Sequence, residues 1–190
     1  MELFYRWFFP VLWLTFLVYW QAMAAGTKTS TRIEPVTSRI VRSVVFLAAI
    51  ALLMLPNLPA RWLYRPILPG GLVCFYLGAA ITVAGLGFAV WARAHLGSNW
   101  SRSVEVKADH ELITSGPYRL VRHPIYSGIL AGFVGSVVAL SEVRGLVAFA
   151  LVFAVLLAKL RMEEAWMRSE FGEKYTAYAR RVRALVPGIL

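Results

Sequence analysis

The sequence predicts an all-α integral membrane protein, a bundle of about five transmembrane helices that forms a single domain over residues 1–190. Hydrophobic residues make up 59% of the chain, whereas about 45–50% is usual in soluble domains. The mean hydropathy is +0.63. The excess lies in long apolar runs close to the ~20 residues that cross a bilayer. We therefore expect these runs to pack on one another in lipid.

The charge and the metal-ligating residues exclude several classes of protein. A net charge of +10 in a membrane protein indicates basic loops that face the cytoplasm and anionic lipid, so we expect no nucleic-acid partner. Cys74 is the single cysteine, which excludes an internal disulfide and a cysteine metal cluster. The three histidines lack a His-x-x-x-His spacing, so we predict no metal site.

The first two predicted spans cover residues 7–25 and 40–58. Only Glu2 and Arg6 carry charge before the first run, and this run is long enough to cross a membrane, so we expect a retained helix rather than a cleaved signal peptide. Pro10 falls in its first turn, where the missing N–H is tolerated. Pro56 and Pro59 end the second span.

The remaining spans are predicted at 72–94, 124–140 and 145–160. Small residues in the third span permit close contact with another helix in lipid: Gly78, Ala79, Ala80, Ala84, Gly85 and Gly87. Residues 141–144 make the last two spans a tight hairpin. The charged tail repeats apolar residues every three to five positions, which predicts an amphipathic helix at the membrane interface, broken near Gly172: Trp166, Phe171, Tyr175, Tyr178, Val182 and Leu185.

Five spans place residues 26–38, 95–123 and 161–188 on one face of the membrane. These segments hold most of the lysines and arginines, so the positive-inside rule puts them in the cytoplasm and the N-terminus outside. We expect residues 95–123 and 161–188 to meet there as catalytic segments that close a pocket. A lipid substrate would then enter sideways, between the third and fourth spans.

The densest polar stretch runs from Gly116 to Gly128. Proline is favoured at the first helical position, so Pro124 places His123 near the N-cap of the fourth span, with Tyr126 on the same helical face. The positive end of that helix can hold an anionic group. Alternatively, Arg119, Arg122 and His123 anchor the chain to lipid headgroups.

Glu163 and Glu164 directly follow the fifth span, beside Lys159 and Arg161. Carboxylates so close to a membrane are costly unless they are paired or functional. On a helix they point about 100° apart, so that one can face inward while the other faces water. An inward carboxylate could bind sugar hydroxyls or an ammonium group, and the alternative is a salt-bridged pair at a solvated position.

The run from His110 to Gly128, the Glu163-Glu164 pair and Phe171-Gly172-Glu173-Lys174-Tyr175 together resemble the isoprenylcysteine carboxyl methyltransferase family, which is related to the membrane phospholipid methyltransferases. The likeness covers about residues 78–188. It implies an enzyme that uses S-adenosylmethionine. It also implies cofactor contacts from His110, Leu112, Ile113, Tyr118, His123, Pro124, Ile125, Tyr126 and Glu163.

On the substrate side the same resemblance implies Arg161 or Lys159, and it makes Arg161 and Glu164 candidate catalytic residues. The Gly85-x-Gly87 pair resembles an element of the phospholipid branch. The short chain resembles prokaryotic members, which implies a bacterial or archaeal cytoplasmic membrane.

The acceptor is left open between several lipophilic or lipidated substrates. The resemblance favours O-methylation of an isoprenylcysteine-type carboxylate, with N-methylation of a phospholipid amine or S-methylation of a small thiol as alternatives. A carboxylate needs no strong base, since alignment and the exclusion of water supply the rate. Two further alternatives are an NADPH-dependent membrane lipid or sterol reductase and a non-enzymatic membrane protein. Membrane lipids are expected partners in every case.

Overall fold

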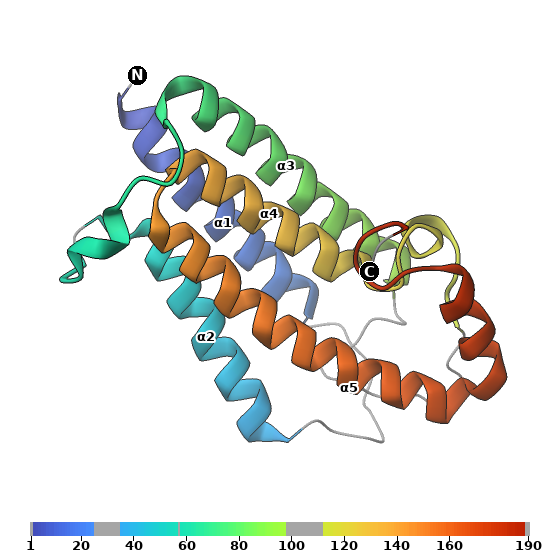
Figure 1. The fold of residues 1–190 in the computed structure, drawn as a ribbon. Coiled ribbons are helices and arrows are strands. Elements are labelled where there is room, and N and C mark those ends of the chain that lie inside the picture. Colours follow the sequence, from blue (N-terminus) through green and yellow to red (C-terminus); the bar gives the residue numbers. More distant parts are fainter. Residues whose placement is uncertain (1, 25–34, 57, 98–111, 189–190) are drawn as a thin grey trace.

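The computed structural model describes residues 2–24, 35–56, 58–97 and 112–188. This part of the chain folds into five α-helices and two short 3-10 helices (Figure 1). In chain order they are α1 (Glu2–Ala24), α2 (Val36–Met54), η1 (Arg61–Tyr64), α3 (Gly71–Leu96), η3 (Gly116–Arg119), α4 (Pro124–Leu140) and α5 (Val143–Arg181). The prediction of an all-α membrane bundle is confirmed.

Four helices of the described chain, α1, α2, α3 and α5, are long and apolar enough to cross a membrane. The fourth predicted span, α4, is shorter at 17 residues, about 26 Å, against a hydrocarbon core of about 30 Å. The second helix starts and stops earlier than predicted, at Val36 and Met54. Leu55 is extended, as expected for the residue before Pro56.

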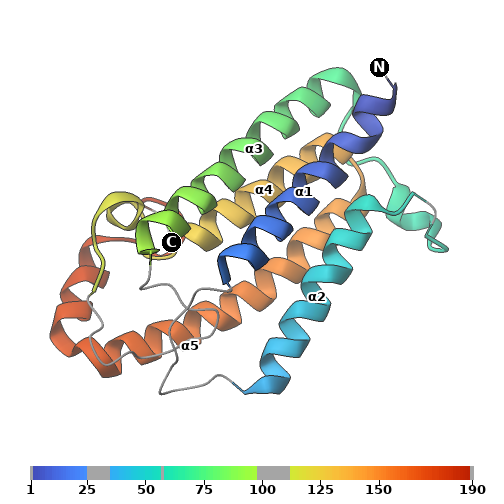
Figure 2. The same cartoon turned by 180° about the vertical axis from the view of Figure 1, so that it is seen from behind.

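Both views of the ribbon place the end of α1, the end of α3 and the start of α4 at one end of the bundle, and α5 continues past this end (Figures 1 and 2). Buried Arg93 near the end of α3 ties two of these elements together, because its Nη2 donates to the carbonyl of Met23 near the end of α1, 2.8 Å away. We call this end the His123 end of the bundle. The described parts of the two predicted catalytic segments meet there.

Glycines bring α3 and α4 into backbone contact. A Cβ added to Gly85 would lie 2.7 Å from the carbonyl oxygen of Gly128, and one added to Gly128 would lie 2.5 Å from that of Gly85. Thr82 adds a hydrogen bond across the same interface, from Oγ1 to the Gly132 carbonyl at 3.1 Å. The packing predicted for the third span is confirmed, but a lipid route between α3 and α4 is wrong, because the two backbones leave no width for a chain.

At the opposite end, Arg144 joins the α4–α5 turn to α2. Its Nη1 donates to the Leu55 carbonyl at 2.6 Å, which satisfies an acceptor at the C-terminus of α2. Its Nε donates to Glu142 at 2.6 Å, and the guanidinium lies 4.9 Å from the ring centroid of Tyr64. This buried arginine therefore fixes the hairpin turn against α2.

The last helix differs most from its prediction. A 16-residue span and a separate tail were expected, but α5 covers 39 residues and consists of two helices joined at a kink. It passes through Glu163 and Glu164 without interruption. Its helix breaks at Gly172, where φ is +52°, as predicted. After the break, Tyr175, Tyr178 and Leu185 are buried against the protein rather than lying on lipid.

The α3–α4 contact predicts opposite effects for two glycine substitutions. Gly128→Ala should lower the free energy of unfolding by about 1–3 kcal/mol, because the new methyl group meets the α3 backbone. Gly87→Ala is the matched control, because a Cβ there meets nothing within 4 Å, and it should stabilise by up to about 1 kcal/mol through helix propensity. Thermal unfolding in detergent measures both, and equal effects would contradict the contact.

Candidate active site

His123 lies between two adjacent carboxylates at the His123 end of the bundle. It is the N-cap residue of α4, followed by Pro124 at the first helical position, as predicted. Its Nδ1 is 3.5 Å from Oε2 of Glu163 and its Nε2 is 3.4 Å from Oε1 of Glu164. The expectation that one glutamate faces water is wrong. The two carboxylates diverge enough to reach opposite nitrogens of one imidazole, so both turn inward.

Glu164 is held by cations from two directions. Arg122 donates from Nε at 2.8 Å and from Nη2 at 2.5 Å to Oε1, and Arg168, one turn further along α5, donates to Oε2 at 3.0 Å. The Glu164 side chain is only 9% exposed. A carboxylate buried and bonded in this way is an anchor for its neighbours rather than a free base.

Glu163 has a different set of partners. The hydroxyl of Tyr126 donates to its Oε1 at 2.6 Å, and the ammonium of Lys159, one turn earlier on α5, is 3.4 Å from the same oxygen. The Tyr126 ring stacks on His123 with a centroid distance of 5.4 Å and an interplanar angle of 6°. The Lys159 ammonium lies 5.7 Å from the centroid of that ring.

The surroundings change the pKa values of His123 and Tyr118, which lie in the segment that connects α3 to α4. Burial alone would lower the pKa of His123, but hydrogen bonds and charges from Glu163 and Glu164 outweigh burial, so the pKa rises above its usual 6.5. Burial also raises the pKa of the Tyr118 phenol, and Glu163 adds to this effect. His123 therefore favours its positive form, which suits a donor between two carboxylates better than a general base.

The C-terminal segment closes over the start of α4. The backbone N–H groups of Arg122 and His123 donate to the carbonyls of Arg183 and Ala184 at 2.8 and 2.9 Å. The Ser127 hydroxyl lies 2.6 Å from the Leu185 carbonyl, which accepts its hydrogen bond. The sequence predicted that the N-terminus of α4 could hold an anionic group. In the structure, the carbonyls of Arg183, Ala184 and Leu185 accept hydrogen bonds at this helix start.

Arg122 couples this closure to the carboxylates. While its Nε and Nη2 bind Glu164, its Nη1 donates to the carbonyl of Ala179 at 3.1 Å and to that of Val182. A second link runs from the Tyr178 hydroxyl to the Tyr118 carbonyl at 2.5 Å. We call the bonds of Arg122 to Glu164, Ala179 and Val182, together with the bond between Tyr178 and Tyr118, the tail latch.

The other predicted cofactor residues lie around this centre with different environments. Tyr118 is buried in η3, and Leu112 and Ile113 are half-buried just before it. Pro124 and Ile125 are buried in the helix start and contribute to packing. His110 lies outside the residues that the structure describes.

Lys159 and Arg161, the two basic candidates before the glutamate pair, differ clearly in exposure and in contacts. Arg161 is exposed on α5, whereas the Lys159 side chain is only 13% exposed and reaches Glu163. Lys159 and Arg161 are two positions apart on a helix, which rotates their side chains by about 200° relative to each other. The two side chains therefore do not share a helical face. Lys159, and not Arg161, belongs to the cluster of side chains around His123, Glu163 and Glu164.

Sequence reasoning missed two contributors. Arg122 was considered as an anchor to lipid headgroups and was not predicted to pair with Glu164, although a buried glutamate at the end of a span requires a cation nearby. His95 was not predicted to contribute at all. Its Nε2 lies 2.9 Å from the Ser115 hydroxyl and its ring stacks on Tyr118, with a centroid distance of 6.5 Å. A lone histidine at the end of an apolar run carries no signal for this contact.

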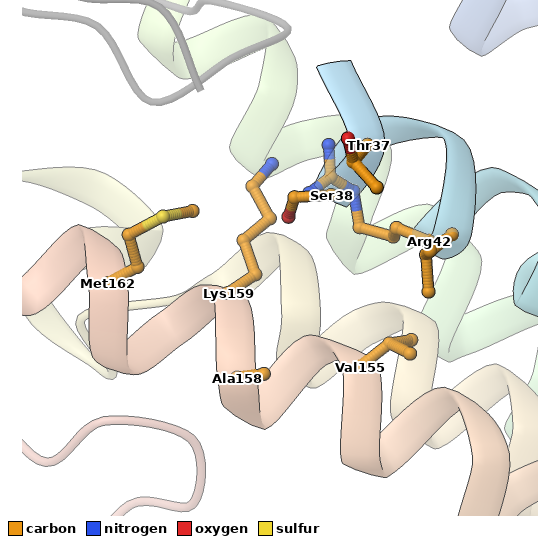
Figure 3. Close-up of a pocket in the computed structure, with 8 residues that line it drawn as sticks. Thr37, Ser38, Arg42, Val155, Ala158, Lys159 and Met162 are labelled. Carbon is orange, nitrogen blue, oxygen red and sulfur yellow. The ribbon is translucent and has the colours of Figure 1, made fainter. Parts of the chain in front are cut away.

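A pocket of about 270 Å³ lies beside the cluster, between the start of α2 and the middle of α5 (Figure 3). Lys159 belongs to both the pocket and the cluster. The pocket is lined by Thr37, Ser38, Val41, Arg42, Val155, Ala158, Lys159 and Met162.

Comparison with known proteins identifies relatives over most of the chain. The family model described as phospholipid methyltransferase matches residues 73–174. The "Probable protein-S-isoprenylcysteine O-methyltransferase" of Oryza sativa subsp. indica is 35% identical over 143 residues, which is 72% of this chain and 68% of the relative. "Protein-S-isoprenylcysteine O-methyltransferase A" of Arabidopsis thaliana is 32% identical over 137 residues, 72% of this chain and 66% of the relative.

One solved structure shares the architecture. It is a eukaryotic intramembrane Ras methyltransferase, described as isoprenylcysteine carboxyl methyltransferase, with a TM-score of 0.52 and 25% sequence identity. The match covers 80% of this chain and 52% of that one. The chain thus spans about half the length of this neighbour.

The tail latch predicts that Arg122→Gln releases the C-terminal segment. Removing the cation leaves Glu164 without its closest partner, and breaking a buried ion pair typically costs about 3–5 kcal/mol. Hydrogen–deuterium exchange should rise over residues 175–185. Arg180→Gln is the control, because its ion pair with Glu173 is 3.9 Å long and exposed, and it should leave exchange unchanged. Equal exchange in the two variants would reject the latch.

His123 predicts a pH dependence of stability. Its pKa is raised in the fold, so its contribution is fully present below the unfolded pKa of about 6.5 and is lost as pH rises through the folded pKa. The thermal midpoint of the detergent-solubilised protein should fall over that window, and His123→Asn should flatten the fall. An unchanged slope in the variant would assign the pH effect to another group.

Proposed function

The chain belongs to the isoprenylcysteine carboxyl methyltransferase family of membrane enzymes, and on this premise we propose that it transfers a methyl group from S-adenosylmethionine to a carboxylate on a lipophilic acceptor. The family model described as phospholipid methyltransferase matches more than half of the chain, residues 73–174, and the Oryza sativa isoprenylcysteine O-methyltransferase is 35% identical over 72% of it. The observation that carries the proposal is the position of His123 between Glu163 and Glu164, with Lys159 beside a pocket. Methyl transfer to an isoprenylcysteine-type carboxylate is the favoured reaction.

The donor set of the cluster fits the proposed cofactor. S-adenosylmethionine combines a carboxylate with an ammonium, a ribose and a sulfonium, and it supplies the electrophilic methyl group when bound. The buried Glu163 suits the ribose hydroxyls or the ammonium, and the positive His123 suits the carboxylate. The aromatic faces of Tyr118 and Tyr126 suit an adenine ring or the sulfonium. His110, Leu112 and Ile113 remain candidate cofactor residues.

The two glutamates have separate roles in this proposal. Glu164 is bonded to Arg122 and Arg168, so we assign it to positioning rather than to the reacting atoms. Glu163 is bound by Tyr126 and Lys159, and His123 lies beside it, and we assign it to the cofactor. Lys159 takes the substrate side in place of the exposed Arg161.

A carboxylate acceptor agrees with the protonation of the site. A carboxylate is already a nucleophile, so alignment and the exclusion of water are sufficient. An amine would have to lose a proton first. Glu163 and Glu164 raise the pKa of His123, and both glutamates are already engaged by hydrogen bonds and charges. By the positive-inside rule, we also propose that the His123 end of the bundle faces the cytoplasm of a bacterial or archaeal cell.

Calorimetric titration of the detergent-purified full chain with S-adenosylmethionine tests the proposed cofactor. We expect micromolar binding and a loss of at least about tenfold in Glu163→Gln, because a charge-assisted bond is removed. Glu173→Gln is the control, because that side chain is 79% exposed, and it should bind normally. NADPH binding without S-adenosylmethionine binding would favour the reductase alternative. Methyl label on N-acetyl-S-farnesylcysteine, and none on phosphatidylethanolamine, would identify the acceptor class.

A further inference from the structure

We infer that residues 173–188 form a hinged lid over the His123 end of the bundle, and that this lid opens each time the cofactor enters or leaves. This inference rests on the proposed function, because it concerns access to the site that we assign to the cofactor. Figure 1 shows the chain turning back after the kink of α5, so that its C-terminal segment (red) lies beside the start of α4. Figure 2 shows the same arrangement from behind.

The side chains that we assign to the cofactor are covered in this structure. The His123 side chain is 10% exposed and that of Glu163 is 21% exposed, and Tyr118 is 8% exposed. A ligand held by these groups has to contact atoms that solvent barely reaches. Part of the structure must therefore move before the cofactor binds and before it leaves.

Gly172 provides the hinge of this lid. Its φ of +52° and ψ of −123° separate the part of α5 that carries Glu163 and Glu164 from the part that carries Tyr175 and Tyr178. Among the described residues, a Cβ added to Gly172 would meet nothing within 4 Å, so side-chain packing does not hold the bend. Glycine also changes its backbone conformation at low cost. The lid can therefore swing about Gly172 while the membrane-spanning part of α5 stays in place.

Neutral hydrogen bonds and a small apolar contact hold the lid closed. The carbonyl of Arg183 accepts a bond from the backbone N–H of Arg122, and the hydroxyl of Tyr178 donates to the carbonyl of Tyr118. Tyr175 contributes the most deeply buried side chain of the lid, at 2% exposure. A terminal segment held in this way opens locally, at a lower free energy than the unfolding of the bundle.

Arg122 allows the lid to open without leaving a buried charge unpaired. Its Nη1 donates to the carbonyls of Ala179 and Val182 in the lid, whereas its Nε and Nη2 bind Glu164 on the fixed part of α5. When the lid opens, water replaces the bonds of Nη1, and the ion pair with Glu164 is kept. The carboxylate therefore stays compensated in the closed and in the open state.

Tyr178→Phe tests the lid, because it removes one bond of the tail latch and keeps the aromatic ring. Surface plasmon resonance of the immobilised full chain in detergent measures the association and dissociation of S-adenosylmethionine. We expect both rate constants to rise about fivefold, the factor that corresponds to one neutral hydrogen bond. The Kd should stay unchanged, because the bond is lost from the free and from the bound closed state alike. Gly172→Ala should also raise both rate constants, since alanine disfavours the positive φ of the closed bend.

Tyr5→Phe is the matched control, because it removes a phenol hydroxyl that shares a hydrogen bond of 2.9 Å with Tyr76 at the opposite end of the bundle. It should leave both rate constants unchanged. A rise of the dissociation rate constant alone in Tyr178→Phe would show that Tyr178 contacts the ligand, and it would overturn the inference. Rate constants equal to those of the unaltered chain would overturn it as well.

Hydrogen–deuterium exchange without any cofactor tests the lid separately from the proposed function. Tyr178→Phe should raise the exchange rates of residues 175–185 about fivefold and leave those of α3 and α4 unchanged. No rise, or a rise that extends over α3 and α4, would reject a lid that opens on its own. A responsive lid in a chain that does not bind S-adenosylmethionine would overturn the proposed function and the role in cofactor exchange. Cofactor binding with an unresponsive segment would overturn the lid alone.

Discussion

The burial of two adjacent carboxylates at the end of a membrane-spanning helix constrains the rest of this structure. An uncompensated charge in this position costs several kcal/mol. Cations and hydrogen-bond donors from separate segments therefore converge on the two carboxylates. Lys159 and Arg168 come from neighbouring turns of α5, and Arg122 and His123 come from the approach to α4. The same contacts fix the register of α4 against α5 and draw the C-terminal segment over both.

The two carboxylates are equivalent in sequence but are used differently. The network around Glu164 is dominated by guanidinium groups and backbone carbonyls, which hold a fixed geometry. The network around Glu163 consists of a phenol, an imidazole and a flexible lysine, and it borders a pocket. In the proposed function, Glu164 is the rigid anchor and Glu163 the adjustable binding group, an arrangement suited to aligning two substrates.

Helix spacing in the bundle determines where such a site is accessible. Glycine pairs bring α3 and α4 into backbone contact, and this stiff pair presents His123 and Tyr126 at its end. Between α2 and α5 the facing side chains are larger and mixed in character, and space is left among them. Arg93 and Arg144 donate hydrogen bonds to carbonyls at the C-terminal ends of α1 and α2, at opposite ends of the bundle. These bonds hold the loosely packed helices α1 and α2 in place.

The sequence by itself determined the membrane class, the break at Gly172, the N-cap position of His123 and the family. These features depend on composition, proline and glycine chemistry and short motifs, which are local. Only the tertiary structure decided that both glutamates face His123, that Lys159 rather than Arg161 joins them, and that Arg122 latches the tail. Such choices depend on the rotation of each helix about its axis and on contacts between residues far apart in sequence, for which an apolar run carries no information.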